Sequence, residues 1–332
     1  MIPRGFPHLS PAELRLLSAV TQPDAVARAA WERWRTDCRV DTAGLPSQAL
    51  FPMLYAHLIA GLGGPDTTLL KGVYRRTWYV NQLALAQLGQ LLNGLAAREI
   101  DALLLNDAAL VAGYYPDIGY RTIGCVDVLV RASDWERSIM TAVEEGWQAE
   151  PGKSFGSPSA LSIMAFGGAE RCSLRIWTNL FAAEPREDTE DRIWRQAGCT
   201  QVNGRAAHIL GPIQQVLCLG AEAVRARETP LVLYADVARV AGSITARSDW
   251  AELVWQAQRY ECILPLRSML GFLQTQLSVP VPPWVVPALH RMAISYAELI
   301  QYHQVCESLP LRLKSAWLRR LAPLWRRPAR AT

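Results

Sequence analysis

One stretch near the middle of the chain decides the fold: residues 100–138 read IDALLLNDAALVAGYYPDIGYRTIGCVDVLVRASDWERS. The opening IDALLL is a short apolar run typical of a buried strand, and residues 108–115 predict a short helix. After a turn-rich segment, VDVLVRA alternates as a strand does. Its three valines share one face, whereas Asp127 and Leu129 share the other. The stretch therefore predicts strand, helix and strand.

The sequence that follows completes a small α+β unit. Ser133 is expected to cap a helix that ends at Gly146. ALSIMAF at 160–166 and RCSLRIW at 171–177 predict two strands joined around a Gly-Gly turn. The resulting order of strand, helix, strand, helix, strand, strand predicts a small mixed sheet within residues 99–182.

Both flanking regions predict helices. Residues 1–98 contain amphipathic segments, the first of which begins at Ser10 with a Pro at the next position and Glu13 three residues on. Residues 183–332 contain further amphipathic segments interrupted by prolines. We therefore expect an α+β, predominantly helical protein whose α/β core lies between two helical regions.

Composition excludes several classes of protein. The chain has 332 residues, of which 50% are hydrophobic and 19% charged, so that intrinsic disorder is excluded as the main state. No run of about 20 apolar residues is present to cross a membrane. The first residues lack the apolar segment of a secretory signal. We therefore expect a cytoplasmic protein.

The cysteines and histidines indicate no metal or disulfide framework. The seven cysteines are scattered without a CxxC pair, and the five histidines show no metal-ligand spacing. Reduced thiols in a cytosol fit this pattern best.

Positive charge is concentrated at the C-terminal end. From residue 311 onward the chain carries seven basic residues and no acidic one, so the remainder has a net charge of −3 within a total of +4. Trp317 and Trp325 would share an apolar stripe there with nearby leucines. Such a basic amphipathic helix can bind an anionic membrane surface, an acidic protein partner or nucleic acid. A helix docked on its own domain is the structural alternative, and no sequence-specific nucleic-acid motif is present.

The central stretch resembles an uncharacterised bacterial family within the DNA polymerase beta-type nucleotidyltransferase superfamily. In that family a strand ends in a Lys-Gly turn before a helix. An Arg and then Gly-Asp-x-Asp-Leu-Leu-Val follow, and a later strand carries Asp-Leu-His-Trp. The likeness extends to FPMLYAHL, GPIQQVLCLGAEAV, LYADVARV, SDWAELVWQAQ and LAPLWRRPAR. It implies a minimal nucleotidyltransferase core between helical regions.

The resemblance also implies a chemistry. Two carboxylates two residues apart on a strand point to one face and can hold Mg²⁺ against nucleotide phosphates. A third carboxylate on a neighbouring strand can share a second metal ion and activate the attacking hydroxyl. The turn before the helix offers backbone N–H groups to the phosphates.

This chain departs from the family pattern at nearly every chemical position. Where the family has Lys-Gly it has Asn106 and Asp107, and Asp107 would repel a phosphate. Cys125 stands at the first metal carboxylate, so that only Asp127 remains on that strand. The third carboxylate is replaced by Ser173 and the family's His by Arg175, whereas Arg121 and Gly124 are retained. The expected ligand-binding residues are Asn106, Arg121, Gly124, Cys125, Ser173 and Arg175. Asp127 and Asp107 would be catalytic, with Asp127 as a metal ligand, only if the protein is active.

The departures predict a protein that keeps the fold and has lost the original catalysis. A thiol is a poor ligand for so hard an ion as Mg²⁺, and one carboxylate of three is unsuited to a two-metal site. We therefore expect a pseudoenzyme without a cofactor that serves as a binding or accessory protein. The resemblance implies a biosynthetic pathway for a peptide or polysaccharide, with a peptide, carrier or protein as its partner.

Two other functions stay open. An active enzyme would use Mg²⁺ and a nucleoside triphosphate, with Asp127 and Asp107 as a re-formed metal pair and Arg121 binding phosphate. Alternatively, Cys125 would act as a nucleophile, which needs a low thiol pKa and a base. Each residue also has a structural interpretation. Asp127 would be a carboxylate bound to Arg121 or backbone N–H groups, and Asp107 would be a helix cap. Arg121 and Arg175 would each form an ion pair with Asp127 or Asp107.

Overall fold

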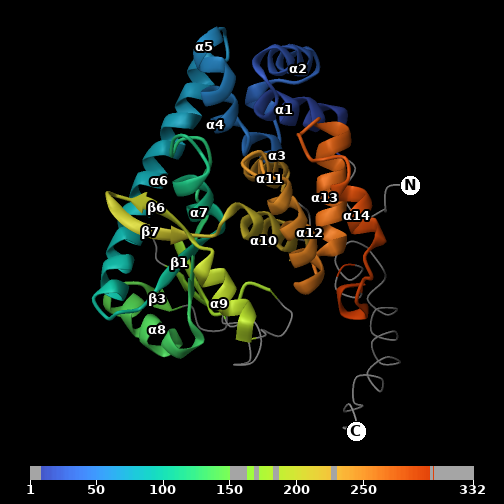
Figure 1. Cartoon of the computed structure of the whole chain (residues 1–332). Helices are drawn as coiled ribbons and strands as arrows, with labels where there is room; N and C mark the ends of the chain where they lie inside the picture. The colour runs from blue at the N-terminus through green and yellow to red at the C-terminus, as the bar shows by residue number, and fades with distance from the viewer. Residues whose placement is uncertain are drawn as a thin grey trace, which may run out of the picture.

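The computed structural model describes residues 9–149, 163–167, 172–181, 187–225, 230–299 and 302. Figure 1 shows the path of the chain. The N-terminal region contains α1 (Pro11–Thr21), α2 (Asp24–Asp37), the 3₁₀ turn η1 (Val40–Thr42), α3 (Leu45–Gln48), α4 (Phe51–Leu54), the π-helical turn η2 (Tyr55–Ile59), α5 (Ala60–Leu62) and the long α6 (Thr67–Ala96). The basic tail from residue 311 and its predicted amphipathic helix lie outside the described residues.

The central region alternates strands and helices. It contains β1 (Ala102–Leu105), α7 (Asn106–Gly113), β2 (Cys125–Val130), η3 (Ala132–Asp134), α8 (Trp135–Glu144), β3 (Gln148–Ala149), β4 (Ile163–Gly167) and β5 (Ser173–Trp177). The predicted elements occur in the predicted order, and the structure adds the two-residue strand β3, which the sequence did not predict. The cap of α8 differs from the prediction, because η3 precedes it and its N-cap is Asp134 instead of Ser133.

The C-terminal region contains more than helices. It comprises α9 (Glu187–Arg195), β6 (Gly198–Val202), β7 (Arg205–Ile209), α10 (Pro212–Arg225), α11 (Leu231–Ala241), α12 (Arg247–Arg259), α13 (Ile263–Gln276) and α14 (Val285–Arg291). The expectation of helix throughout this region is wrong at residues 198–209, which form a β-hairpin. Its turn residues Asn203 and Gly204 both have positive φ, of 50° and 74°. Asn-Gly is the pair that such tight hairpin turns favour.

The strands form one mixed seven-stranded sheet in the order β3-β4-β5-β2-β1-β7-β6. β2 pairs antiparallel with β1 and parallel with β5, while β7 joins the other side of β1 in parallel. The C-terminal hairpin thereby extends the sheet of the central region. The α+β fold class is confirmed.

Each face of the sheet is covered by helices, which explains the apolar strands. Leu104 and Val128 pack with leucines of α6 in one core cluster. Leu103 and Leu129, one residue along, pack instead in a second cluster with the helices α10 to α13. Figure 1 shows α6 along one side of the sheet and α10 beyond the other. Asp127 has the parity of Leu129, so its side chain lies on the α10 face, as the alternation predicts.

Two smaller features agree with the sequence. The side chain of Ser10 accepts a hydrogen bond from the backbone of Glu13, whose carboxylate bonds the Ser10 backbone, so the predicted capping box is present. Gly146 follows α8 with a φ of 85°, a conformation that glycine adopts without strain. None of the helices in the described ranges combines the length and the hydropathy needed to cross a bilayer.

Candidate functional site

The predicted site residues gather where β2, β5 and the first turn of α7 meet. Asp127 and Arg175 are register partners in the parallel strands β2 and β5, so their side chains lie side by side on one face. Leu105, the last residue of β1, is paired with Asp127. The chain turns directly from there into α7, which places Asn106 beside the same carboxylate.

Asp127 is completely buried and its carboxylate is fully engaged. Arg175 donates from Nε to Oδ1 at 2.5 Å and from Nη2 to Oδ2 at 2.7 Å. Trp177 Nε1 donates to Oδ1 at 2.7 Å, and Asn106 Nδ2 donates to Oδ2 at 3.0 Å. A buried carboxylate is stable only with such compensation. Asp127 is therefore held as a structural ion pair, with partners other than the Arg121 or backbone groups that the structural interpretation named.

Asn106 holds a backbone conformation suited to this contact. Its φ is +47°, in the left-handed region that asparagine tolerates better than most residues. Its side-chain oxygen accepts a weak hydrogen bond from the thiol of Cys218 at 3.7 Å. The residue that replaces the family's lysine thus serves as a neutral link between Asp127 and α10.

A second buried network surrounds Arg121. Its Nη2 donates to Asp107 Oδ1 at 2.7 Å, and its Nε lies 3.1 Å from Asp236 Oδ2. Asp236, on α11, is completely buried and also accepts a hydrogen bond from Tyr115 Oη at 2.7 Å. Asp107 accepts a further bond from the backbone N–H of Gly124 at 2.9 Å. The predicted pairing of Arg121 with Asp107 is present, and the carboxylate lies inside α7 rather than capping it.

Asn81 of α6 holds the loop that carries Arg121. The buried Asn81 amide donates to the carbonyl oxygens of Ile118 and Arg121 at 2.5 and 2.6 Å. Its side-chain oxygen accepts the backbone N–H of Ile123 at 2.9 Å. Three of the four hydrogen bonds that the Asn81 side chain can form therefore hold this loop. The loop in turn places Arg121 between Asp107 and Asp236.

Asp236 was missed by the sequence reasoning. It is the one acidic residue in α11, LVLYADVARVA, where nearly every other position is apolar. A carboxylate in so apolar a helix is a candidate for burial, and a buried carboxylate needs a cationic or hydrogen-bonding partner. That signal was available in the sequence, although the sequence could not name Arg121 as the partner.

Burial and the charges of these clusters shift the pKa values of several side chains. Burial alone would lower the pKa of Arg121, and the charges of Asp107 and Asp236 more than offset that effect. Burial raises the pKa of Asp236 above its usual value, an effect that Arg121 opposes. Burial, followed by the nearby charge of Asp127, raises the pKa of the Cys125 thiol to about 12.

These residues do not fit a Mg²⁺ site. Mg²⁺ needs free oxygen ligands in near-ideal octahedral geometry. Both oxygens of Asp127 already accept charged hydrogen bonds, and Asp107 is engaged by Arg121. Cys125 and Ser173, register partners on β2 and β5, offer a protonated thiol and a hydroxyl that is 3.5 Å from the Gly124 carbonyl oxygen. Within the described ranges, no three His, Cys, Asp or Glu side chains form a group that could hold a metal ion.

Cys125 is expected to be a slow thiol. With a pKa of about 12, only roughly one molecule in 10⁴ carries the reactive thiolate at pH 8. Iodoacetamide should therefore label Cys125 at least about tenfold more slowly than the exposed Cys199. Peptide mass spectrometry over a labelling time course measures both rates, and labelling in denaturant, where both should react alike, is the control. Preferential labelling of Cys125 in the folded protein would instead support the nucleophile hypothesis.

The chain is similar to known nucleotidyltransferases through a family profile. A structure of an antigenic nucleotidyltransferase-like protein from Paracoccidioides brasiliensis matches with a TM-score of 0.33 and 13% sequence identity, covering 64% of this chain and 95% of that one. No curated protein sequence matches. The profile of a family described as "Uncharacterised nucleotidyltransferase" matches residues 45–277, which include the whole site. The chain therefore belongs to this nucleotidyltransferase family.

Proposed function

We propose that this protein is a nucleotidyltransferase-fold binding or accessory protein that no longer performs Mg²⁺-dependent nucleotidyl transfer. The ion pair between the buried Asp127 and Arg175 is the observation that carries the proposal. In the family pattern described above, a metal carboxylate occupies the position of Asp127. Here the charge that neutralises this carboxylate comes from a side chain of the protein itself.

Electrostatics argues against exchange of that side chain for a metal ion. Mg²⁺ could bind Asp127 only after Arg175 and Trp177 had given up their hydrogen bonds to it. Removing one member of a buried ion pair costs about 3–5 kcal/mol. Mg²⁺ would also have to shed part of its hydration shell without a second free carboxylate as compensation. The same reasoning applies to Asp107, which is held by Arg121.

The proposal predicts no metal-dependent nucleotide binding. Calorimetric titration with ATP, GTP, CTP and UTP, each with and without Mg²⁺ or Mn²⁺, should give no difference in heat between the metal-containing and metal-free series. The wild-type protein is the right subject, because removal of Asp127 is expected to destabilise the fold.

Metal-dependent binding would contradict the proposal. If that binding were also lost in Asp107→Asn, whose side chain is partly exposed, an active enzyme with an Asp127–Asp107 metal pair would be supported. The acceptor hydroxyl would then be the next question.

The proposal extends to a biological setting. A cytoplasmic accessory protein in a peptide or polysaccharide pathway would bind a peptide, a carrier or another protein. The conserved fold would then serve as a scaffold for that partner rather than as a catalyst. Co-purification from the native cell, followed by mass spectrometry, would identify the partner.

A further inference from the structure

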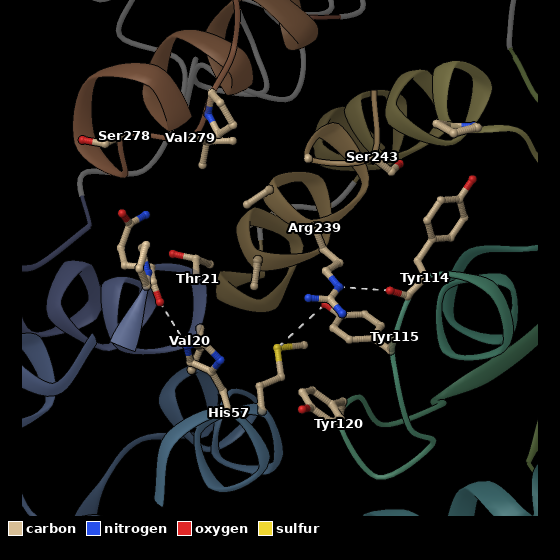
Figure 2. Close-up of a pocket in the computed structure, with 18 of the residues that line it drawn as sticks. Val20, Thr21, His57, Tyr114, Tyr115, Tyr120, Arg239, Ser243, Ser278 and Val279 are labelled. Carbon is tan, nitrogen blue, oxygen red and sulfur yellow. Dashed lines mark hydrogen bonds between the residues drawn. The ribbon is translucent and has the colours of Figure 1, made fainter. Parts of the chain in front are cut away.

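A cavity of about 710 Å³ lies away from Asp127 and Arg175, between the N-terminal helices and α11 (Figure 2). Its walls come from the end of α1, from η2, from the segment after α7, from α11 and from the turn after α13. This volume falls within the range of about 300–1,000 Å³ that small-molecule sites occupy. None of the eight residues predicted for the nucleotidyltransferase site contributes to its lining.

Aromatic rings and apolar side chains form the larger part of the walls, beside polar side chains such as Thr21, Ser243 and Ser278. Tyr115 and Tyr120 lie with ring centroids 6.1 Å apart, and Met53 and Val279 add apolar surface. The Tyr115 hydroxyl donates to Asp236 at 2.7 Å, so the ion-pair network around Arg121 fixes this ring in place. A wall held in this way is preorganised, which lowers the entropic cost of binding a ligand.

One arginine, Arg239, faces this cavity. The Nε of Arg239 donates to the carbonyl oxygen of Tyr114 at 3.0 Å, and its guanidinium lies 5.7 Å from the centre of the Tyr115 ring. Figure 2 shows Arg239 over Tyr115 on the cavity side of α11. In the described part of the chain Arg239 forms no ion pair, and the cavity lining contains no Asp or Glu.

The buried Asp236, three residues before Arg239 on α11, does not line the cavity. Its carboxylate accepts hydrogen bonds from Tyr115 and from Arg121, which Asp236 shares with Asp107. The other ionisable side chain of the lining, His57, is occupied through its Nε2, which lies 2.9 Å from the Gln22 carbonyl oxygen. The free edge of the Arg239 guanidinium is therefore the charged group that a ligand would meet.

We propose that this cavity binds a small organic acid, in which one carboxylate is attached to an aromatic body. Arg239 binds the carboxylate through its planar fork of N–H donors, a geometry that matches carboxylate oxygens. The tyrosine rings pack against the aromatic body. One arginine suits a single negative charge better than a polyanion such as a nucleotide. A free acid and the C-terminal residue of a peptide share this chemistry.

The test compares acids with their neutral amides. Indole-3-acetate and N-acetyl-phenylalanine are titrated beside indole-3-acetamide and N-acetyl-phenylalanine amide, with binding measured by ligand-observed NMR and calorimetry. At least one acid should bind about tenfold or more tightly than its amide, because the amide lacks the charge that Arg239 binds. Acetyl-Gly-Gly-Phe and its amide form a third pair, which distinguishes a peptide C-terminus from a free acid.

Arg239→Gln should remove the preference for acids, and Arg28→Gln should keep it. Both arginines are exposed on helices, so neither substitution is expected to disturb folding, and both remove one positive charge. Equal binding of acids and amides, no binding of any acid, or an unchanged preference in Arg239→Gln would overturn the proposal. The test is independent of the proposed loss of catalysis, because it contains neither metal nor nucleotide.

Discussion

Asp127→Ala is expected to lower the free energy of unfolding by about 3–5 kcal/mol. The substitution leaves Arg175 without its bidentate partner and removes the buried oxygens that accept hydrogen bonds from Trp177 and Asn106. Unpaired buried donors cost about 1–3 kcal/mol each, although Arg175 can turn toward solvent, since a third of its side chain is exposed. The loss should appear as a lower midpoint in urea denaturation with an unchanged slope.

Asp101→Ala is the control, because it removes an exposed carboxylate instead of a buried one. Asp101 is exposed and lies 3.9 Å from Arg131, so its removal should change stability by less than about 1 kcal/mol. Asp127→Leu combined with Arg175→Met should be less destabilised than Asp127→Leu alone, because it removes both charges. A metal ligand in an open site would behave differently: its removal would leave the metal-free protein as stable as before. That outcome would contradict the structural role of Asp127 and weaken the proposed function.

Arg121→Met is expected to cost a similar amount, about 3–5 kcal/mol at neutral pH. Arg121 is the shared partner of Asp107 and of the completely buried Asp236. Without it, the Asp236 carboxylate keeps, among the described residues, only the hydrogen bond from Tyr115. An isolated buried carboxylate avoids this cost by taking up a proton, so the pKa of Asp236 should rise further in the variant.

The cost of Arg121→Met should therefore depend on pH. A carboxyl whose pKa is higher in the folded than in the unfolded state binds more protons when folded. Its contribution to stability then falls as pH rises between those two values. In the wild-type protein burial raises the pKa of Asp236 and Arg121 restrains that rise. Removing Arg121 raises the folded-state pKa of Asp236 further and so extends this pH range upward. The variant should therefore recover part of its stability as the pH is lowered from 8 to 5.

Urea denaturation of both proteins at several pH values measures this difference. Arg137→Met, which removes an exposed arginine that pairs with Asp134, is the matched control and should cost less than about 1 kcal/mol at every pH. A penalty for Arg121→Met that stayed constant between pH 5 and 8 would show that Asp236 does not titrate there. A small penalty would show that the carboxylates are compensated without Arg121.

Much of the fold could be predicted from local pattern. Alternation in VDVLVRA predicts that Asp127 lies on the strand face opposite the three valines, and the structure confirms this. Ser10 and Glu13 predicted the first helix because a capping box acts within one turn. The hairpin at residues 198–209 was missed although Asn203-Gly204 is a strong local turn signal. Most side chains of its two strands are exposed or half-buried, so these strands lack the apolar runs that mark the buried strands β1 and β2.

The partners of the site residues could not be predicted in the same way. Family resemblance named Asp127, Arg175, Asp107 and Arg121, but their pairings depend on which strands and helices become neighbours. Arg175 reaches Asp127 because β5 pairs in parallel with β2. Arg121 reaches Asp236 because α11 packs against the segment that follows α7. Asp236 lies 115 residues from Arg121 in the chain, a separation on which local periodicity carries no information.

The sequence by itself determined the α+β fold, the position of the site on β2, and the replacement of family carboxylates by Cys125 and Ser173. These properties depend on the order and periodicity of residues, which local backbone geometry reads directly. Only the tertiary structure decided that Asp127 is saturated by Arg175, Trp177 and Asn106, and that Arg239 faces a cavity without an acidic partner. The physical reason is that charge compensation is a property of packed neighbours, and packing joins residues that are distant in the sequence.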